Sequence, residues 1–337
     1  LAKLAYPRLA KVAPKLLRPA VRWHLRRQLK TVKNVHDVQM VAADYLDDMI
    51  ESRCSGVTVS GLENLPQEGG CLILSNHRDI ALDPALINYS RYHHGLETVR
   101  IAIGDNLLSK PFAADLMRLN KSFIVPRSAR APKKMLVAFK KLSAYIKHSV
   151  QEDGETVWMA QREGRAKDGL DRTEPAIIKM ITMNRNKAEE SFADYIRAMR
   201  LMPATVSYEW DPCDVKKAEE LLAVSTTGSY QKAEHEDLKS IGLGIEGEKG
   251  AIHVAYGTLF VGDYDTPEQV ATALDEQIID NYVLHPSNLC AYEKQTGEQC
   301  GLSWGKDEKT ALPDGAMAAF DQRFVDLSDE LREQGLL

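Results

Sequence analysis

The sequence predicts an α/β fold in which a mostly parallel, twisted sheet is flanked by helices and preceded by an N-terminal helical segment. Two observations lead to this prediction. Short apolar runs alternate with longer stretches of helical periodicity, which is the order typical of βαβ units. One of these runs, residues 71–75, is continuously apolar up to Ser75, as expected of a strand buried on both faces of a parallel sheet. The crossovers between such strands are expected to be right-handed.

The predicted elements follow in order along the chain. A helix over residues 35–52 comes first, and Gly56 marks the change to the two-residue period of a strand at 57–61. Further strands are expected at residues 71–75, 98–103, 122–125, 156–160 and 205–208, and helices at 84–93, 111–119, 132–150 and 175–183. Several helices begin with proline, whose missing N–H costs nothing in the first turn. Residues 251–260 predict a strand that could join the sheet antiparallel, and helices over 266–282 and 316–334 follow.

Charge is distributed unevenly along the chain. Residues 1–34 contain ten Lys or Arg and no acidic residue, whereas the rest carries 33 basic and 48 acidic groups, so the net charge of −5 hides an acidic body. Tyr6 and Trp23 lie among the cations, and three prolines divide the segment into short pieces. This composition suits helices lying on an anionic membrane surface, where each cation contributes roughly 1 kcal/mol. The alternatives are a basic helix packed on the acidic body and an organellar transit peptide.

The expected domain organisation follows from this charge pattern. Residues 1–55 form a basic, membrane-associating helical segment, and residues 56–337 form an α/β domain that includes the C-terminal helices. The basic segment is not expected to span a bilayer, because a cation interrupts it every few positions. The five cysteines include no C-x-x-C pair, which argues against a zinc ribbon or a disulfide framework and favours a reducing compartment. The expected location is therefore the cytoplasmic face of a membrane.

The residues that follow the predicted strands are candidates for a functional site. In open α/β sheets, ligands bind beyond the carboxyl ends of the strands. Three of the strand ends supply one histidine, several carboxylates and many cations, a composition suited to proton abstraction beside a bound anion. They are His77, Asp79 and Asp83; then Arg127; then Arg162, Glu163, Gly164, Arg165 and Lys167. Taken singly, each has a structural explanation, and Asp83-Pro84 has the pattern of a helix N-cap followed by proline.

These residues resemble four ordered sequence blocks of the glycerolipid acyltransferases, the family that includes glycerol-3-phosphate and 1-acylglycerol-3-phosphate acyltransferases. The blocks lie within about residues 70–210. In order they are Asn76-His77 with Asp83-Pro84, Phe123-Ile124-Val125-Pro126-Arg127, Glu163-Gly164-Arg165, and Met202-Pro203 through Tyr208-Glu209. Each motif alone is weak, but four in this order at plausible intervals form a strong signal.

The resemblance implies transfer of a fatty acyl group from a thioester, either acyl-CoA or an acylated acyl carrier protein, to a hydroxyl of a phosphorylated glycerol. His77 would be the general base, because an imidazole with an ordinary pKa of about 6.5 can take the hydroxyl proton near neutral pH. Asp83 would fix the far ring nitrogen. No covalent acyl-enzyme, metal or redox cofactor is implied, and no nucleic acid is expected as a partner.

The resemblance also implies roles for the second and third blocks. Arg127 and Arg165 would hold the acceptor's phosphate, which a guanidinium can grip with two hydrogen bonds. Gly164 would let the backbone approach, and Glu163 would orient the cations or bind a glycerol hydroxyl. The expected acceptor is 1-acylglycerol-3-phosphate, because the chain lacks the large extra domains of many glycerol-3-phosphate enzymes. Glycerol-3-phosphate and a non-catalytic lipid-binding role are the alternatives.

The chain departs from the family pattern at two places. Five residues, not four, separate His77 from Asp83, so Asp79 is the rival partner of the histidine. Asp83 is preferred, because a carboxylate at a helix cap would point back toward the strand end. In the third block Ala166 stands where the family has Arg, which leaves open whether Arg162, Arg165 or Lys167 takes that role. A separate glycine pattern, Gly242-Leu-Gly244-Ile-Glu-Gly247, follows a predicted helix, and we interpret it as a helix end and turn and not as a nucleotide-binding loop.

Overall fold

The computed structural model describes residues 32–108, 115, 117–126, 131–233 and 235–331, together with Pro19, Trp23, Arg26, Arg27 and Lys30. The chain forms two compact units, Leu1–Tyr45 and Leu46–Leu337. The basic segment predicted at residues 1–34 lies almost wholly outside the described residues. Helix α4 (Val35–Arg53) agrees with the first predicted helix. Within the described residues, no helix combines the length and apolar character needed to cross a bilayer.

The second unit alternates strands and helices, as predicted. Its strands are β1 (Cys54–Ser60), β2 (Leu72–Ser75), β3 (Arg100–Gly104), β4 (Ser122–Val125), β5 (Val157–Ala160), β6 (Leu201–Tyr208) and β7 (Gly250–Tyr256). Its helices are α5 (Leu82–Tyr92), α7 (Pro132–Gln151), α8 (Pro175–Ile181), α9 (Phe192–Ala198), α10 (Asp214–Thr227), α11 (Glu236–Glu246), α12 (Pro267–Asp280), α13 (Pro286–Thr296) and α14 (Ala316–Arg323). Proline begins α7, α8, α12 and α13, where a missing N–H leaves no hydrogen bond unmade.

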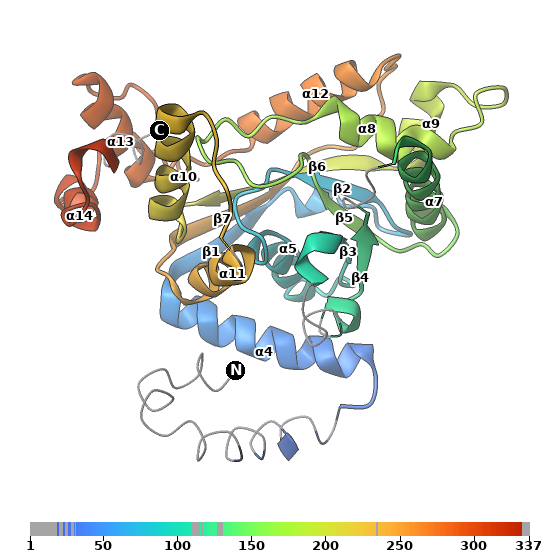
Figure 1. Ribbon diagram of the computed structural model, residues 1–337, viewed down its shortest axis with the longest axis horizontal. Coiled ribbons are helices and arrows are strands. Elements are labelled where there is room, and N and C mark those ends of the chain that lie inside the picture. Colours follow the sequence, from blue (N-terminus) through green and yellow to red (C-terminus); the bar gives the residue numbers. More distant parts are fainter. Residues whose placement is uncertain are drawn as a thin grey trace. The chain divides into compact units, whose positions relative to one another are not determined.

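The strands of the described residues form one sheet in the order β1-β7-β6-β2-β5-β3-β4. Neighbours are parallel except β6 and β7, which are antiparallel. The predicted mostly parallel sheet is thereby confirmed, and the antiparallel pairing suggested for residues 251–260 occurs in β7. Since β2 to β6 all run in one direction, their carboxyl ends meet at a single edge of the sheet. Figure 1 shows α8, α9 and α12 on one side of the sheet and α5 and α11 on the other.

Alternate residues of the strands contribute to two cores, one on each face of the sheet. In β2, Leu72 and Leu74 pack with side chains of α7, α8, α9 and α12, whereas Ile73 packs on the opposite face with side chains of α5. All three are fully buried. Coverage of both faces explains why this strand is continuously apolar and does not alternate between apolar and polar residues.

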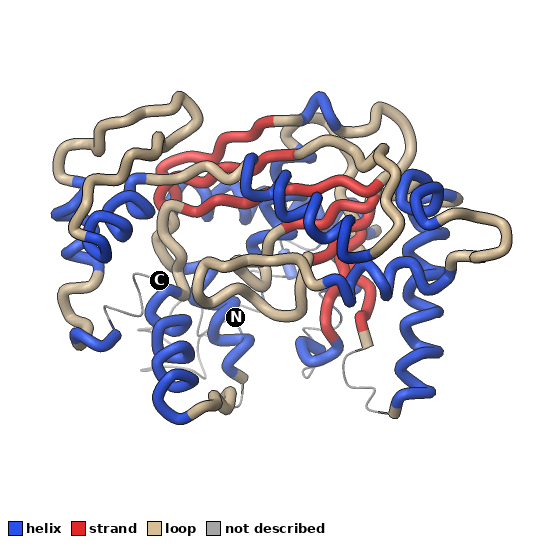
Figure 2. The backbone as a smooth tube through the Cα atoms, turned by 90° about the horizontal axis from the view of Figure 1, so that it is seen from above, coloured by secondary structure: helices blue, strands red, loops and turns tan. Residues whose placement is uncertain are grey.

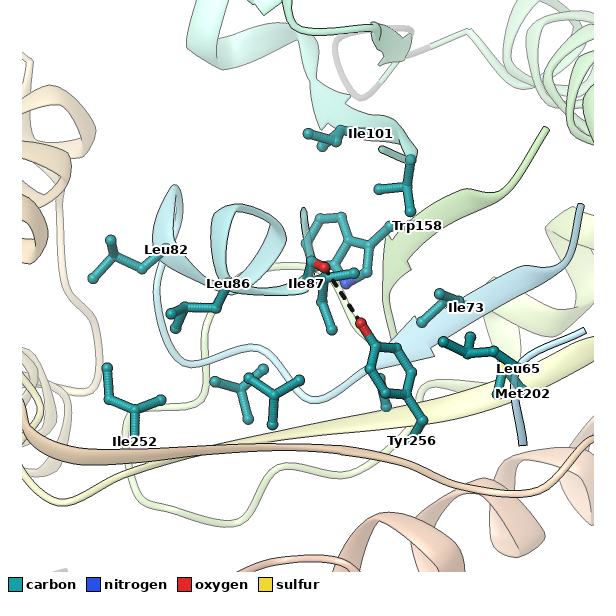
Figure 3. Close-up of a cluster of buried hydrophobic side chains, with 14 of the residues drawn as sticks. Leu65, Ile73, Leu82, Leu86, Ile87, Ile101, Trp158, Met202, Ile252 and Tyr256 are labelled. Carbon is teal, nitrogen blue, oxygen red and sulfur yellow. Dashed lines mark hydrogen bonds between the residues drawn. The ribbon is translucent and has the colours of Figure 1, made fainter. Parts of the chain in front are cut away.

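The core beneath α5 fixes the helix that carries part of the candidate site. Leu86 and Ile87 of α5 lie over the sheet, and Tyr256 reaches up from β7 (Figure 3). The Tyr256 hydroxyl and the Ser90 hydroxyl are 2.7 Å apart and share a hydrogen bond, which satisfies two polar groups inside an apolar layer. The first turn of α5 is therefore held against the sheet by packing on its next two turns.

Several elements differ from their predictions. The helix predicted over residues 316–334 ends at Arg323 in α14. Strand β6 begins at Leu201, four residues before the predicted strand. The prediction began too late because Pro203, which lies within β6, interrupts the strand pattern in the sequence. The Pro203 carbonyl accepts from the Gly257 N–H beyond the end of β7, so the missing proline N–H falls where that ladder has ended. The glycine pattern is only partly a helix end: Gly242 and Gly244 lie inside α11, and only Gly247 follows it as the cap.

His253 of β7 supports a pH-dependent stability prediction. Its Nδ1 lies 2.7 Å from the Thr58 hydroxyl and its Nε2 lies 2.8 Å from the Ser60 hydroxyl, both on β1. Burial, with a smaller contribution from Lys306, lowers its pKa from 6.5 to about 4. Between pH 6.5 and about 4, His253 therefore binds a proton in the unfolded chain but not in the folded chain. Stability should be complete above pH 6.5 and fall by at most about 3 kcal/mol as the pH drops from 6.5 to about 4.

Chemical denaturation of a His253→Gln variant across this pH range tests the prediction. Glutamine retains one donor and one acceptor for the two hydroxyls but does not titrate, so the part of the decline due to His253 should disappear. The matched control, His148→Gln, replaces an exposed histidine and should keep the decline. Identical slopes for the parent and the His253 variant would contradict the assignment.

Candidate active site

The end of β2 is fixed to β6 through the side chain of Asn76. The Asn76 amide donates to the Val206 carbonyl at 3.0 Å and accepts from the Val206 N–H at 2.8 Å. These two bonds reproduce a strand ladder after β2 has ended, and Asn76 is itself buried. The residue that follows, His77, is therefore placed at the carboxyl edge of the sheet by a rigid connection and not by a free loop.

His77 and Asp83 form a buried pair. His77 Nδ1 lies 2.9 Å from Asp83 Oδ2, and the Asp83 side chain is fully buried. The same Oδ2 accepts from the backbone N–H groups of Arg78 at 2.7 Å and Asp79 at 3.0 Å. Since Oδ2 acts as the acceptor in these bonds, Nδ1 is the donor to it, and in the neutral imidazole Nε2 then carries a free lone pair.

Tyr208 completes the surroundings of Asp83. Its hydroxyl, at the end of β6, donates to Asp83 Oδ1 at 2.8 Å. Burial, together with the charges of Asp83 and Asp79, raises the pKa of Tyr208 well above its ordinary value, so the phenol stays protonated and acts as a donor. Both carboxylate oxygens of Asp83 are thus held by groups from the loop, the sheet and the histidine.

Asp79 caps the helix that carries Asp83. Its Oδ1 accepts from the N–H groups of Ala81 and Leu82, each at 2.9 Å. The expected cap position of Asp83 is therefore wrong: α5 begins at Leu82, and Asp83 lies in its first turn. The additional loop residue supplies this separate cap, and Asp83, not the rival Asp79, bonds to the His77 ring.

The second carboxylate oxygen of Asp79 faces α11. Oδ2 is buried without a hydrogen-bond partner among the described residues, and a Cβ added to Gly244 would lie 2.3 Å from it. Only glycine leaves room for the carboxylate at this point of α11. Burial and the neighbouring Asp83 raise the pKa of Asp79.

The backbone of His77 is held by the loop that follows β5. Its N–H donates to Asp171 Oδ2 at 2.7 Å, and its carbonyl accepts from the Ala166 N–H at 3.0 Å. Asp171 is in turn bonded by the Gln161 amide at 3.0 Å. Burial raises the pKa of Asp171, although the Gln161 and His77 donors oppose the shift. The loop carrying the third sequence block is therefore attached directly to the histidine backbone.

The side chains of the third block differ in exposure and pairing. Glu163 is exposed, and Gly164 has a φ of 76°, a conformation that favours glycine. Arg165 is nine-tenths buried, and its Nη1 has no hydrogen-bond partner among the described residues. Lys167, by contrast, forms an ion pair with Glu220. Arg162 donates to the Leu170 carbonyl at 3.4 Å, and its buried Nε has no hydrogen-bond partner among the described residues.

Comparison with known proteins shows what the region that contains this site is similar to. Residues 56–176 match the sequence model of a protein family described as Acyltransferase. Residues 56–176 therefore resemble an acyltransferase domain. No curated protein sequence matches the chain at a significant level. Among solved structures, the chain is similar to the 1-acyl-sn-glycerophosphate acyltransferase PlsC from Thermotoga maritima, with 13% identity, a TM-score of 0.44, and coverage of 82% of this chain and 91% of that chain.

The match confirms the family resemblance seen in the sequence, and it includes three of the four blocks. His77, Asp83 and the Glu163–Arg165 turn lie within residues 56–176, and Ala166, directly after the turn, donates its N–H to the His77 carbonyl. Arg127 lies outside the described residues, so its expected position near His77 stays a prediction. Within the described part of the chain, no three His, Cys, Asp or Glu side chains form a group that could hold a metal ion.

The candidate site contains residues whose place in it the sequence did not predict. Tyr208 was noted as part of a motif, but its contact with Asp83 depends on β6 lying next to β2, which the chain order does not reveal. Asp171 lies outside the recognised blocks, and no local pattern marks it. Nε2 of His77 has no partner among the described residues, and 11% of the side chain is exposed, an arrangement compatible with a general base.

Proposed function

We propose that this chain transfers a fatty acyl group from an acyl thioester to the free hydroxyl of 1-acylglycerol-3-phosphate. The observation that carries the proposal is the His77–Asp83–Tyr208 chain of hydrogen bonds, which leaves one imidazole nitrogen available at the carboxyl edge of the sheet. The match to an acyltransferase family supports the reaction class, and the buried Arg165 would supply a cation for an acidic acceptor.

The proposed reaction is a single displacement. Nε2 of His77 takes the proton of the acceptor hydroxyl while the oxygen attacks the thioester carbonyl. The new C–O bond forms, the C–S bond breaks, and the imidazolium returns its proton to the departing thiolate. Asp83 stabilises the imidazolium through Nδ1, and Tyr208 keeps the carboxylate oriented by its bond to Oδ1.

The acceptor's phosphate is proposed to bind at the Glu163–Arg165 turn. A buried guanidinium with an unused N–H leaves part of its hydrogen-bonding capacity unmet, and a phosphate oxygen would satisfy it. This favours Arg165 over Lys167, which Glu220 already pairs, whereas Arg162 also has an unpaired buried N–H and stays an alternative. Gly164 would allow the backbone to approach, Glu163 would bind a glycerol hydroxyl or orient the cation, and Arg127 would add a second guanidinium.

The surroundings of the reaction are proposed from the sequence. Residues 1–55 would associate with the cytoplasmic face of a membrane through their basic and apolar side chains, and residues 56–337 would form the catalytic domain. The thioester would be acyl-CoA or an acylated carrier protein, and the displacement as written uses neither a metal nor a redox cofactor.

A matrix of donors and acceptors tests the proposal. Purified protein would be incubated with acyl-CoA or acylated carrier protein and with lysophosphatidate, glycerol-3-phosphate, an amine or a sugar. Thiol release would be followed by its absorbance after reaction with a disulfide reagent, and the lipid product would be identified by mass. We expect phosphatidate and one thiol per ester formed. Turnover only on glycerol-3-phosphate would show that this compound, and not 1-acylglycerol-3-phosphate, is the acceptor. No turnover on any glycerolipid would indicate a non-catalytic lipid-binding protein.

A further inference from the structure

The first two turns of α7 have an unusual surface. Every residue from Ala131 to Val137 is exposed, whereas the second half of the helix buries Leu142 and Ile146 in the core. In Figure 2, α7 is the long helix at the right, and its lower end projects beyond the strands. This end of the helix therefore contributes little to the core of the domain and is available to another surface.

The exposed turns combine apolar and basic side chains. Met135, Leu136 and Val137 are 39%, 52% and 68% exposed. Lysines 133, 134, 140 and 141 are also exposed, and none of the four pairs with a carboxylate among the described residues. The sequence of α7 contains no acidic residue at all. A helix with this composition is suited to a surface that is both anionic and apolar.

The arrangement around the helix axis distinguishes a bilayer from a protein partner. Consecutive helical residues are about 100° apart, so Met135, Leu136 and Val137 cover about 200° of the circumference. A groove on a partner protein would require a single apolar stripe with i, i+3, i+4 spacing. Apolar side chains on more than half of the circumference of a projecting helix end are suited to an environment that surrounds the helix. The interface of a lipid bilayer is such an environment.

The position of α7 relates this surface to the candidate active site. Strands β2 and β4 run in the same direction in one sheet, so His77 after β2 and the start of α7 after β4 lie at the same edge. We propose that the N-terminal two turns of α7, residues 132–137, insert into the interface of an anionic membrane. The catalytic edge would then face the lipid that contains the acceptor. The inference extends the proposed function, but its binding test does not depend on turnover.

Vesicle partitioning of the full chain tests this inference. Vesicles of phosphatidylcholine with phosphatidylglycerol would be sedimented with the parent and with a Leu136→Ser/Val137→Ser variant, which we expect to partition at least about tenfold more weakly. Because the contributions of two simultaneous anchors multiply, this change is expected even while the basic N-terminal segment also binds. Lys133→Gln and Lys134→Gln should each weaken binding about fivefold on anionic vesicles. The matched control is Val261→Ser, at an equally exposed position away from α7.

A depth measurement separates insertion from a general loss of affinity. A tryptophan introduced as Val137→Trp should be quenched by lipids brominated in their acyl chains, whereas Val261→Trp should not. Circular dichroism of each variant checks that the fold is kept. Unchanged partitioning together with an unquenched tryptophan at 137 would overturn the inference. So would a Leu136→Ser/Val137→Ser variant that keeps its vesicle binding but no longer binds immobilised acyl carrier protein, since that face would then dock the carrier.

Discussion

Replacing His77 with alanine is expected to lower kcat with lysophosphatidate and acyl-CoA by about 10²- to 10⁴-fold. The variant retains the acceptor and donor surfaces but has no group to take the hydroxyl proton. KM should change far less than kcat, because the imidazole acts on the reacting atoms and not on the bound phosphate. Steady-state thiol release measures both constants. Asp83→Asn should reduce kcat as well, since an amide nitrogen cannot accept the three hydrogen bonds that converge on Oδ2.

Two controls make the His77 result specific. His253→Gln removes another buried histidine, in the same sheet but bonded to β1, and should keep its activity at neutral pH. Thermal unfolding of the His77 variant should show a folded protein, because Asp83 keeps its bonds to Tyr208 and the loop amides. An active His77→Ala variant would exclude His77 as the base and indicate that another group at this edge of the sheet takes the proton.

The largest expected effect on stability is at Lys217 of α10. Its side chain is 5% exposed, forms an ion pair with Asp211 and donates to the Arg78 carbonyl at 2.9 Å. Burial alone would raise the pKa of Asp211, but Lys217 and Arg78 outweigh it and lower that pKa. Lys217→Met would leave this buried carboxylate without its ammonium partner, with the Arg78 guanidinium 3.9 Å away and the Cys213 N–H bonded to Oδ1 at 2.8 Å. We expect a loss of about 3–5 kcal/mol in urea unfolding.

The adjacent lysine provides the matched control for this variant. Lys216 is 55% exposed and pairs with Glu219 on the helix surface, so Lys216→Met should change stability by less than about 0.5 kcal/mol. A double variant, Asp211→Asn with Lys217→Met, should recover part of the loss, because no uncompensated charge stays buried. Equal effects of Lys217→Met and Lys216→Met would show that the buried ion pair has no special importance.

Most of the sheet could be predicted because its signals are local. The apolar run before Ser75, the prolines that begin α7 and α12 and the alternation of strands with helices are all properties of short windows. The strand order could not be predicted, since it depends on which strands meet after folding. The start of β6 was misplaced for a related reason: Pro203 breaks a strand pattern locally, but the end of the β7 ladder removes the cost.

The site was predictable to the extent that it follows strand ends. His77, Asp83 and the Glu163–Arg165 turn come directly after β2 or β5, and parallel strands bring those ends together. Tyr208 and Asp171 acquire their functions only through neighbours distant in sequence, so no local pattern indicates what they do. The choice between Asp79 and Asp83 was settled by the loop amides, which no sequence pattern describes.

The anchoring of Asp83 has a consequence for finding related enzymes. Its carboxylate is fixed by the first turn of α5 and by Tyr208, while the connecting loop merely folds its amides onto it. Insertion of a residue in that loop therefore leaves the histidine–aspartate geometry intact. Search patterns that demand one fixed interval between the two residues would overlook homologues with longer loops. A pattern that joins the Asp-Pro pair to a tyrosine at the end of a later strand would retain them.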